Sequence, residues 1–268
     1  MTTPSGNLFA VVTGASSGIG YELARKLADH GYDLLIIAED DGIEPAAANL
    51  RRDGGNQVTA VRADLAGYDG VEKAWAAIRA TGRDIDALAL NAGRGIGGAF
   101  VGETPLGDEL NVIDVNVIST VHLAKLALPG MVARKSGRVL FTSSIASMMP
   151  GTYQAVYNAS KSFVQSFAEA LRAELKDTGV TVTALMPGPT DTNFFHRADM
   201  DDTRVGAGAK DDPAQVAAQG VDALLKGDEK VSAGSLKTKA QSMASKVLPD
   251  RAKAEMHRRM AEPGSAPE

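Results

Sequence analysis

Three side chains in the second half of the chain are spaced so that they could move a proton. Tyr157 and Lys161 are four residues apart in a segment that predicts a helix, and Ser144 stands thirteen residues before the tyrosine. Residues at that helical spacing share one face. A free phenol has a pKa of about 10, and a cation beside it stabilises the phenolate. The group indicates acid/base chemistry, although the same pair also fits an ordinary amphipathic helix surface.

A glycine-rich turn near the N-terminus could hold a phosphate group. An apolar run at residues 8–12 predicts a buried strand, residues 21–28 predict a helix, and Gly14, Gly18 and Gly20 lie between them. Glycines let a pyrophosphate approach the amides of a helix N-terminus, where the macrodipole favours negative charge. The spacing differs from the common G-x-G-x-x-G fingerprint. A purely structural turn therefore remains the alternative.

The elements that must position these residues alternate along the chain. Apolar runs separated by helical patterns predict right-handed β-α-β units and a parallel sheet covered on both faces. The predicted strands are residues 8–13, 33–38, 57–63, 87–90, 137–142, 180–186 and 230–233. In such sheets ligands bind beyond the carboxyl ends of the strands, so one crevice would collect the motifs.

Further motifs follow the other strands, and together they resemble the classical short-chain dehydrogenase/reductase family from about Leu8 to Gly234. Asn116 stands 28 residues before Ser144, as the asparagine of that family's tetrad does. Leu90 departs from the pattern, because an additional asparagine is often found there. The resemblance implies an α/β fold of the Rossmann type: a doubly wound, mostly parallel seven-stranded sheet with helices on both faces, plus a C-terminal helical extension.

By this resemblance the catalytic residues are Asn116, Ser144, Tyr157 and Lys161. Tyr157 would be the general acid in reduction and the base in oxidation. Ser144 would bind the substrate oxygen, a role for which the spacing favours it over Ser143. Lys161 would bind the nicotinamide ribose and depress the Tyr157 pKa. Asn116 would hold a water linked to Lys161, which is compatible with its bonding the backbone at a helix irregularity.

The resemblance also implies a nicotinamide dinucleotide cofactor. The cofactor-binding residues expected are Gly14, Ser16, Ser17, Gly18, Ile19, Gly20, Glu39, Asp64, Leu65, Asn91, Ala92, Gly93, Tyr157, Lys161, Pro187, Gly188, Thr190 and Thr192. Glu39 favours NAD over NADP, because a carboxylate accepts bonds from a ribose hydroxyl and repels a 2'-phosphate. Ala38, however, stands where the family's selecting aspartate usually lies, and residues 39–41 also fit a merely solvated acidic loop.

Composition narrows the range of functions. The chain has 268 residues, 44% hydrophobic content, a net charge of -5 and no cysteine, so disulfides and thiolate sites are excluded. The four histidines show no ligand spacing, which predicts surface or packing roles and no metal. The acidic balance argues against a nucleic-acid partner. No signal segment or membrane-spanning run is recognised, so a cytoplasmic location is expected.

The predicted domain organisation is simple. Residues 1–234 are expected to form one dinucleotide-binding and catalytic domain with a substrate-loop insertion near 193–210, and residues 235–268 a helical extension of it. Helices at 110–133 and 153–176 form subunit interfaces in the family, which implies a homodimer or homotetramer. The extension predicts two short amphipathic helices separated by Pro249. They would cover the substrate mouth, pack on another subunit or touch an anionic membrane, and residues 263–268 are expected to be disordered.

The predicted function is hydride transfer between a nicotinamide dinucleotide and the carbinol or carbonyl carbon of an apolar secondary alcohol or ketone. Phe194, Phe195 and Met200 in the loop insertion favour an apolar substrate, or they only pack a lid. The nearby acids Asp199, Asp201 and Asp202 would suit a cationic or polyhydroxylated one. The alternative function is a non-catalytic dinucleotide-binding redox sensor or regulatory module. Epimerisation or dehydration would need a larger substrate domain than the chain has room for.

Overall fold

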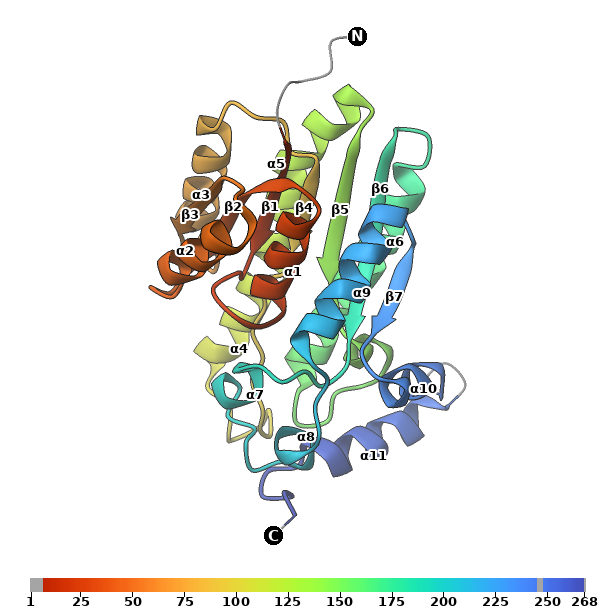
Figure 1. The fold of residues 1–268 in the computed structure, drawn as a ribbon. Coiled ribbons are helices and arrows are strands. Elements are labelled where there is room, and N and C mark those ends of the chain that lie inside the picture. Colours follow the sequence, from red (N-terminus) through yellow and green to blue (C-terminus); the bar gives the residue numbers. More distant parts are fainter. Residues whose placement is uncertain (1–6, 245–247, 268) are drawn as a thin grey trace.

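A seven-stranded parallel sheet forms the centre of the molecule, and its strands run in the order β3-β2-β1-β4-β5-β6-β7 (Figure 1). The computed structural model describes residues 7–244 and 248–267. The strands are β1 (Leu8–Thr13), β2 (Tyr32–Ala38), β3 (Val58–Arg62), β4 (Ala87–Leu90), β5 (Gly137–Thr142), β6 (Val180–Pro187) and β7 (Lys230–Ala233). Every neighbouring pair is parallel. The predicted fold class is confirmed, and each strand boundary agrees with the prediction within one residue.

Helices cover both faces of this sheet. They are α1 (Gly18–Asp29), α2 (Ile43–Gly54), α3 (Tyr68–Ala80), α4 (Leu106–Ile113), η1 (Asp114–Ile118), α5 (Ser119–Arg134), η2 (Ile145–Met148), α6 (Ala155–Glu174), α7 (Phe194–Arg197), α8 (Arg204–Ala207), α9 (Pro213–Lys226), α10 (Leu236–Ala244) and α11 (Asp250–Ala261). One core layer joins the sheet to α3, α5 and α6. The other joins it to α1, α2 and α9. Successive strand residues serve opposite layers, so that Val11 packs in the first and Val12 in the second.

The sheet changes winding direction between β1 and β4. From β1 the chain continues outward to β2 and β3, whereas from β4 it continues to β5, β6 and β7 on the other side. The loops that leave β1 and β4 consequently turn toward opposite faces. Such a switch point opens a crevice beyond the carboxyl ends of the two strands. The glycine-rich turn and the loop at Asn91 meet there.

One continuous helical stretch, Leu106–Arg134, is long and apolar enough to cross a membrane by length and composition. Its α5 part carries Leu123, Ala127 and Met131 into the core layer over the sheet, which accounts for its apolar character. The stretch is not a uniform α-helix as predicted, because η1 is a π-helical turn. The second predicted long helix begins at Ala155 rather than at Tyr153, whose φ of 66° is left-handed.

The C-terminal helices pack against the carboxyl end of the sheet (Figure 1). Pro249 separates them as expected and precedes the first turn of α11. The expectation of disorder is wrong for residues 263–267: Gly264 and Ala266 donate their backbone N–H groups to Asp202, at 2.7 and 2.8 Å. These long-range bonds order a segment whose composition carries no ordering signal. Residues 1–6, 245–247 and 268 lie outside the described residues.

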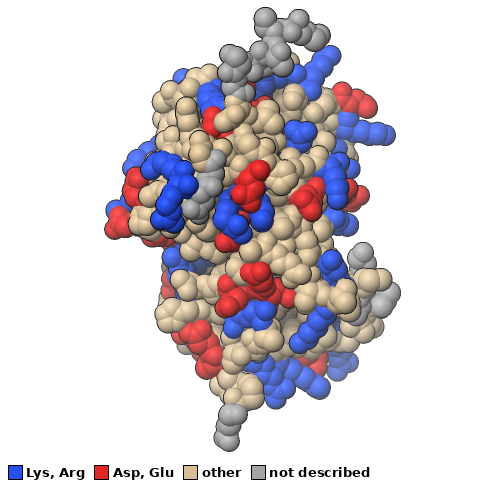
Figure 2. Space-filling view, viewed as in Figure 1, with Lys and Arg blue, Asp and Glu red and all other residues tan. Residues whose placement is uncertain are grey.

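The charged side chains are mixed in sign on the face shown in Figure 2. Lysines and arginines gather toward the lower end of that view, over α11. Within α11 they form ion pairs along the helix, such as Arg258 with Glu262 and Arg259 with Glu255. Exposed pairs of this kind contribute little to stability. The basic character of the extension is therefore partly balanced within the helix itself.

Candidate active site

The glycine-rich turn is built from backbone that comes too close for side chains. A Cβ on Gly20 would lie 2.0 Å from the carbonyl oxygen of Gly14, and one on Gly14 would lie 2.8 Å from Cα of Ala92. Gly14 also has a φ of 66°, which favours glycine. Ser17 precedes α1 without capping it through its side chain. The first-turn amides of α1 are thus left for an anionic ligand.

The switch point is held together by a short network between β1, β4 and β5. Thr13 Oγ1 accepts hydrogen bonds from the backbone N–H groups of Asn91 and Ala92, both at 2.9 Å. The Asn91 side chain donates to the Thr13 carbonyl at 3.1 Å and accepts from Thr142 Oγ1 at 3.1 Å. Asn91 therefore fixes the two loops in place. This structural role is sufficient to explain why Asn91 lies beside the crevice.

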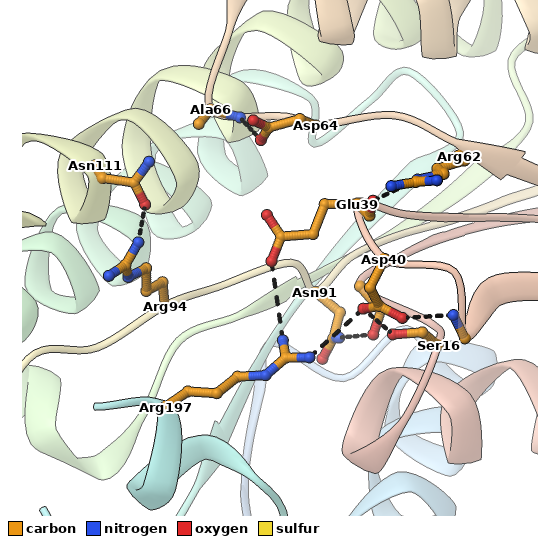
Figure 3. Close-up of polar contacts among 12 residues, drawn as sticks. Ser16, Glu39, Asp40, Arg62, Asp64, Ala66, Asn91, Arg94, Asn111 and Arg197 are labelled. Atoms are coloured by element: carbon orange, nitrogen blue, oxygen red, sulfur yellow. Dashed lines mark hydrogen bonds and ion pairs between the residues drawn. The ribbon is translucent and has the colours of Figure 1, made fainter. Parts of the chain in front are cut away.

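An acidic loop follows β2, and an arginine from α7 reaches across to it (Figure 3). Ser16 Oγ donates to Asp40 at 2.8 Å. Arg197, in α7, lies 3.9 Å from a carboxylate oxygen of Glu39 and 3.5 Å from one of Asp40. Arg62 Nε donates to the Glu39 carbonyl at 3.0 Å. Arg197 was not predicted, because nothing in the sequence around residue 197 indicates a partner more than 150 positions away.

Tyr157 lies almost buried, with 9% of its surface exposed. Burial raises its pKa to about 12, and a hydrogen bond with Ser144 opposes the rise. Its ring lies 5.2 Å from that of Phe194, centroid to centroid. A buried phenol that keeps its proton at neutral pH is suited to donate it to a substrate oxygen.

Lys161 occupies the same wall one helical turn further along α6. It is 5% exposed, and its ammonium donates to the Thr142 carbonyl at 3.0 Å. Burial lowers its pKa to about 8. Nζ lies 5.9 Å from the centre of the Tyr157 ring. In the protein alone, burial outweighs the contribution that lowers the Tyr157 pKa, so the expected depression of this pKa by Lys161 together with a cationic nicotinamide ring stays a prediction.

The two adjacent serines differ in their contacts. Ser144 Oγ donates to the Pro187 carbonyl at 3.4 Å and accepts from the backbone N–H of Ala146 at 3.1 Å at the start of η2, and it is near enough to Tyr157 to lower the pKa of the phenol. Ser143 Oγ instead donates to the carbonyl of Lys161 at 2.9 Å. Of the pair, Ser144 therefore lies beside the phenol, and Ser143 helps to hold α6 against β5. The catalytic role of Ser144 stays a prediction.

Asn116 sits in the π-helical turn η1 and is 1% exposed. Its amide nitrogen donates to the Arg94 carbonyl and to Ser160 Oγ, each at 2.9 Å, and its oxygen accepts from the Arg94 N–H at 2.8 Å. A side-chain carbon on Gly93 would meet Lys161 Nζ at 3.1 Å and Asn116 Oδ1 at 3.4 Å. Asn116 thus bonds the backbone at a helix irregularity, close to the ammonium.

A cavity of about 630 Å³ runs along these residues. Every predicted catalytic and cofactor-binding residue lines it except Asn116, which lies behind the wall. The sequence analysis missed several lining residues, among them Arg94, Gln154, Arg197, Gln241, His257 and Met260. Phe194 and Phe195 also line the cavity, and Phe195 packs with Met200 and with Ala261 of α11. α11 therefore forms part of the cavity wall, and the expectation that the extension covers the substrate mouth stays a prediction.

The fold and these motifs match those of known oxidoreductases. A family model described as short chain dehydrogenase matches residues 8–203. The uncharacterized oxidoreductase YmfI of Bacillus subtilis is 32% identical over 193 residues, covering 71% of this chain and 78% of that protein. Serine 3-dehydrogenase of Agrobacterium fabrum is 32% identical over 185 residues, covering 69% and 72%. The chain belongs to the short-chain dehydrogenase family.

Solved structures agree with that assignment. A short-chain dehydrogenase from Sphingobium yanoikuyae, in complex with NADPH, superimposes with a TM-score of 0.76 at 28% identity, covering 84% of this chain and 87% of the other. The seven-stranded parallel sheet is shared. The protein is therefore an oxidoreductase of the short-chain dehydrogenase type.

Proposed function

We propose that this protein transfers a hydride between a nicotinamide dinucleotide and the carbinol or carbonyl carbon of a small alcohol or ketone, with Tyr157 as the general acid/base. One observation carries the proposal: Ser144 and the buried Tyr157 line the same cavity as the glycine-rich turn, and Ser144 is near enough to the phenol to lower its pKa. A proton donor, a second hydroxyl and an anion-binding helix terminus thus face the same space.

The described residues fit a dinucleotide. The close backbone of the glycine-rich turn and the uncapped first turn of α1 suit a pyrophosphate. Asp64 and Leu65 line the part of the cavity after β3, where an adenine would lie. When bound, the nicotinamide supplies or accepts the hydride. The protein's own contribution is to orient the reactants and to exchange a proton at the Tyr157 oxygen.

The proton steps assign different tasks to Tyr157 in the two directions. With a pKa near 12 the phenol is protonated at neutral pH and can donate to a developing alkoxide. Ser144 would donate to the same oxygen, as a preorganised hydrogen bond that strengthens as charge develops. In oxidation the phenol must lose its proton, so positive charge beside it is needed. Lys161 is the nearby cation, and its ammonium lies against the face of the ring.

Replacing Tyr157 by phenylalanine tests the proposal. Loss of the hydroxyl should reduce kcat by about 10²–10⁴-fold, the usual size of a general acid contribution, while the cofactor still binds. The exposed Tyr68, on α3, offers a matched control, and Tyr68→Phe should keep wild-type rates. Cofactor binding followed by nicotinamide fluorescence and turnover followed by nicotinamide absorbance give the two readouts. Binding without turnover of any alcohol or ketone by the wild type would indicate the non-catalytic sensor instead.

For the cofactor we propose NAD(H). Glu39 and Asp40 line the cavity after β2. Their carboxylates would accept a hydrogen bond from the ribose 2'-hydroxyl of NAD and repel the 2'-phosphate of NADP. Two observations support NADP(H): the Sphingobium yanoikuyae structure contains NADPH, and Arg197 brings a cation to the same place. Titration of the protein with NADH and with NADPH shows which cofactor binds more tightly. Glu39→Arg should weaken NADH relative to NADPH, whereas Glu44→Arg, exposed on α2, should leave the ratio unchanged.

We also propose that the protein forms a homodimer or homotetramer. Large apolar side chains are exposed along α4, η1 and α6: Leu106, Leu110, Ile118 and Phe163 have between 42% and 70% of their surface exposed. Burial of such surface is the usual driving force of association. Light scattering of wild type and Ile118→Glu would test this, since a charge at a buried contact should shift the protein toward monomer.

We propose further that residues 235–268 belong to the same domain as 1–234, because Ala261 packs with Phe195.

A further inference from the structure

The wall of the cavity contains a carboxamide whose nitrogen has no hydrogen-bond partner among the described residues. Gln154 is 7% exposed and lines the cavity. Its Nε2 is buried and makes no hydrogen bond within the part of the chain that the structure describes. A buried donor left unpaired is costly, and native proteins pair nearly all of them. An unpaired amide in the wall of a binding cavity therefore indicates a group on the ligand that pairs with it.

A histidine from the C-terminal extension lines the same cavity. His257, in α11, is 5% exposed, and its Nδ1 lies 2.9 Å from the carbonyl oxygen of Thr152. A carbonyl only accepts, so Nδ1 carries the hydrogen. Burial lowers the pKa of His257, which favours the neutral ring. Nε2 is then a lone-pair acceptor, and among residues 7–244 and 248–267 it has no hydrogen-bond partner.

One turn of the chain holds both groups in place. Thr152 anchors the histidine through its carbonyl and anchors α11 through its hydroxyl, which donates to the Ala254 carbonyl at 3.0 Å. Tyr153 follows in a left-handed conformation, and its carbonyl accepts from Gly98 at 2.9 Å. Gln154 then precedes the first turn of α6, three residues before the tyrosine that donates the proton. A strained, well-anchored turn of this kind is typical of a binding site.

We propose that Gln154 and His257 bind a second hydroxyl of the substrate, so that the enzyme acts on hydroxylated ketones and polyols rather than on simple apolar alcohols. A hydroxyl is the common group that accepts one hydrogen bond and donates another, as a carboxamide donor and an imidazole acceptor together require. The neighbouring Phe194 and Met260 would contact the carbon skeleton. This inference rests on the proposed hydride transfer at Tyr157 and adds the substrate class.

Cyclohexanone and its 2-, 3- and 4-hydroxy derivatives test the inference, because they move one hydroxyl around a constant skeleton. Two readouts are taken with saturating reduced cofactor: the rise in Tm at equal ligand concentration, and kcat/KM. At least one hydroxyketone should exceed cyclohexanone by about tenfold in kcat/KM and raise Tm further, since a site built to hydrogen-bond a hydroxyl discriminates against its absence. Equal behaviour of all four ketones in both readouts would overturn the inference.

Two variants locate the preference. Gln154→Met keeps the length of the side chain without its polar atoms, and His257→Asn keeps a donor for Thr152 but has no Nε2. In each, the ratio of hydroxyketone to cyclohexanone should fall toward one. Gln165→Met makes the same replacement on α6 outside the cavity, and its ratio should stay at the wild-type value. A preference that survives both cavity variants would place the second hydroxyl elsewhere and overturn the assignment.

The Tm readout separates this inference from the proposed function. It needs binding only, so it still decides between the ketones if no turnover is seen. Absence of turnover with a clear preference in Tm would count against Tyr157 chemistry and in favour of the hydroxyl site. Turnover of all four ketones at one rate, with no preference in Tm, would count against the hydroxyl site alone.

Discussion

The buried ammonium of Lys161 should make the free energy of unfolding rise with pH between about pH 8 and pH 10.5. Its pKa is lowered from 10.5 to about 8 by burial. The unfolded chain therefore binds this proton more tightly than the folded one, and stability increases as pH rises between those two values. At low pH this lowered pKa destabilises the folded protein by about 3 kcal/mol. Between pH 7 and 9.5, about 2 kcal/mol of it should be recovered.

Lys161→Met isolates that contribution. Urea unfolding of wild type and variant at pH 7 and pH 9.5 gives four free energies, and the difference between the two proteins should change by about 2 kcal/mol in favour of wild type as pH rises. Other titrating groups cancel in the comparison. Lys125→Met, an exposed replacement on α5, should show no such change. If the Lys161 difference is the same at both pH values, the ammonium is not desolvated and the reasoning about its pKa is refuted.

Three further outcomes follow from the geometry. Gly20→Ala puts a carbon 2.0 Å from a carbonyl oxygen of the same loop, so nicotinamide fluorescence should show at least about tenfold weaker cofactor binding, whereas Gly67→Ala, with open space around it, should bind normally. Arg197→Gln should change the free energy of unfolding by less than about 1 kcal/mol, because the ion pairs of Arg197 with Glu39 and Asp40 are partly exposed. The substitution removes these ion pairs across the cavity, so cofactor dissociation in stopped flow should become faster and less sensitive to salt. Burial opposes the ionisation of Asp33, but its hydrogen bonds, foremost from Arg83, outweigh that and lower its pKa. Asp33→Asn should therefore cost stability at pH 7 and cost less as pH falls below about 3.8, which acid unfolding curves would show; equal cost at both pH values would contradict this.

The sheet was predictable because its signals are local. Each strand is a short apolar run bounded by glycine or polar residues, and a parallel sheet buried on both faces needs little else. The position of the glycine-rich turn followed in the same way. The alternation of strands and helices also placed the motifs at one edge, where the cavity lies.

The polar part of the cavity wall beside α11 was not predictable, because it depends on tertiary contacts. His257 was predicted to be a surface or packing residue, and only the return of α11 over Thr152 brings it to the cavity. Arg197 similarly gains its meaning from α7 lying across from the acidic loop. The raised pKa of Tyr157 in the protein alone was not predictable either, since the extent of burial cannot be seen in a spacing of four residues.

The π-helical turn at η1 also bears on how this protein can tolerate change in length. A π turn holds one residue more than the α turn it replaces. Deleting a single residue between Asp114 and Ile118 would let the backbone close into a regular α-helix, with every hydrogen bond of the ladder restored. Because a π turn absorbs its extra residue by widening, α4 and α5 would keep nearly the same directions after the deletion. The exposed apolar side chains Leu106 and Leu110 on α4 would therefore stay where they are. What would be lost is local: the bulge places Asn116 against Arg94 and Ser160, so the deletion would break these contacts while leaving the outer surface of the helix in place.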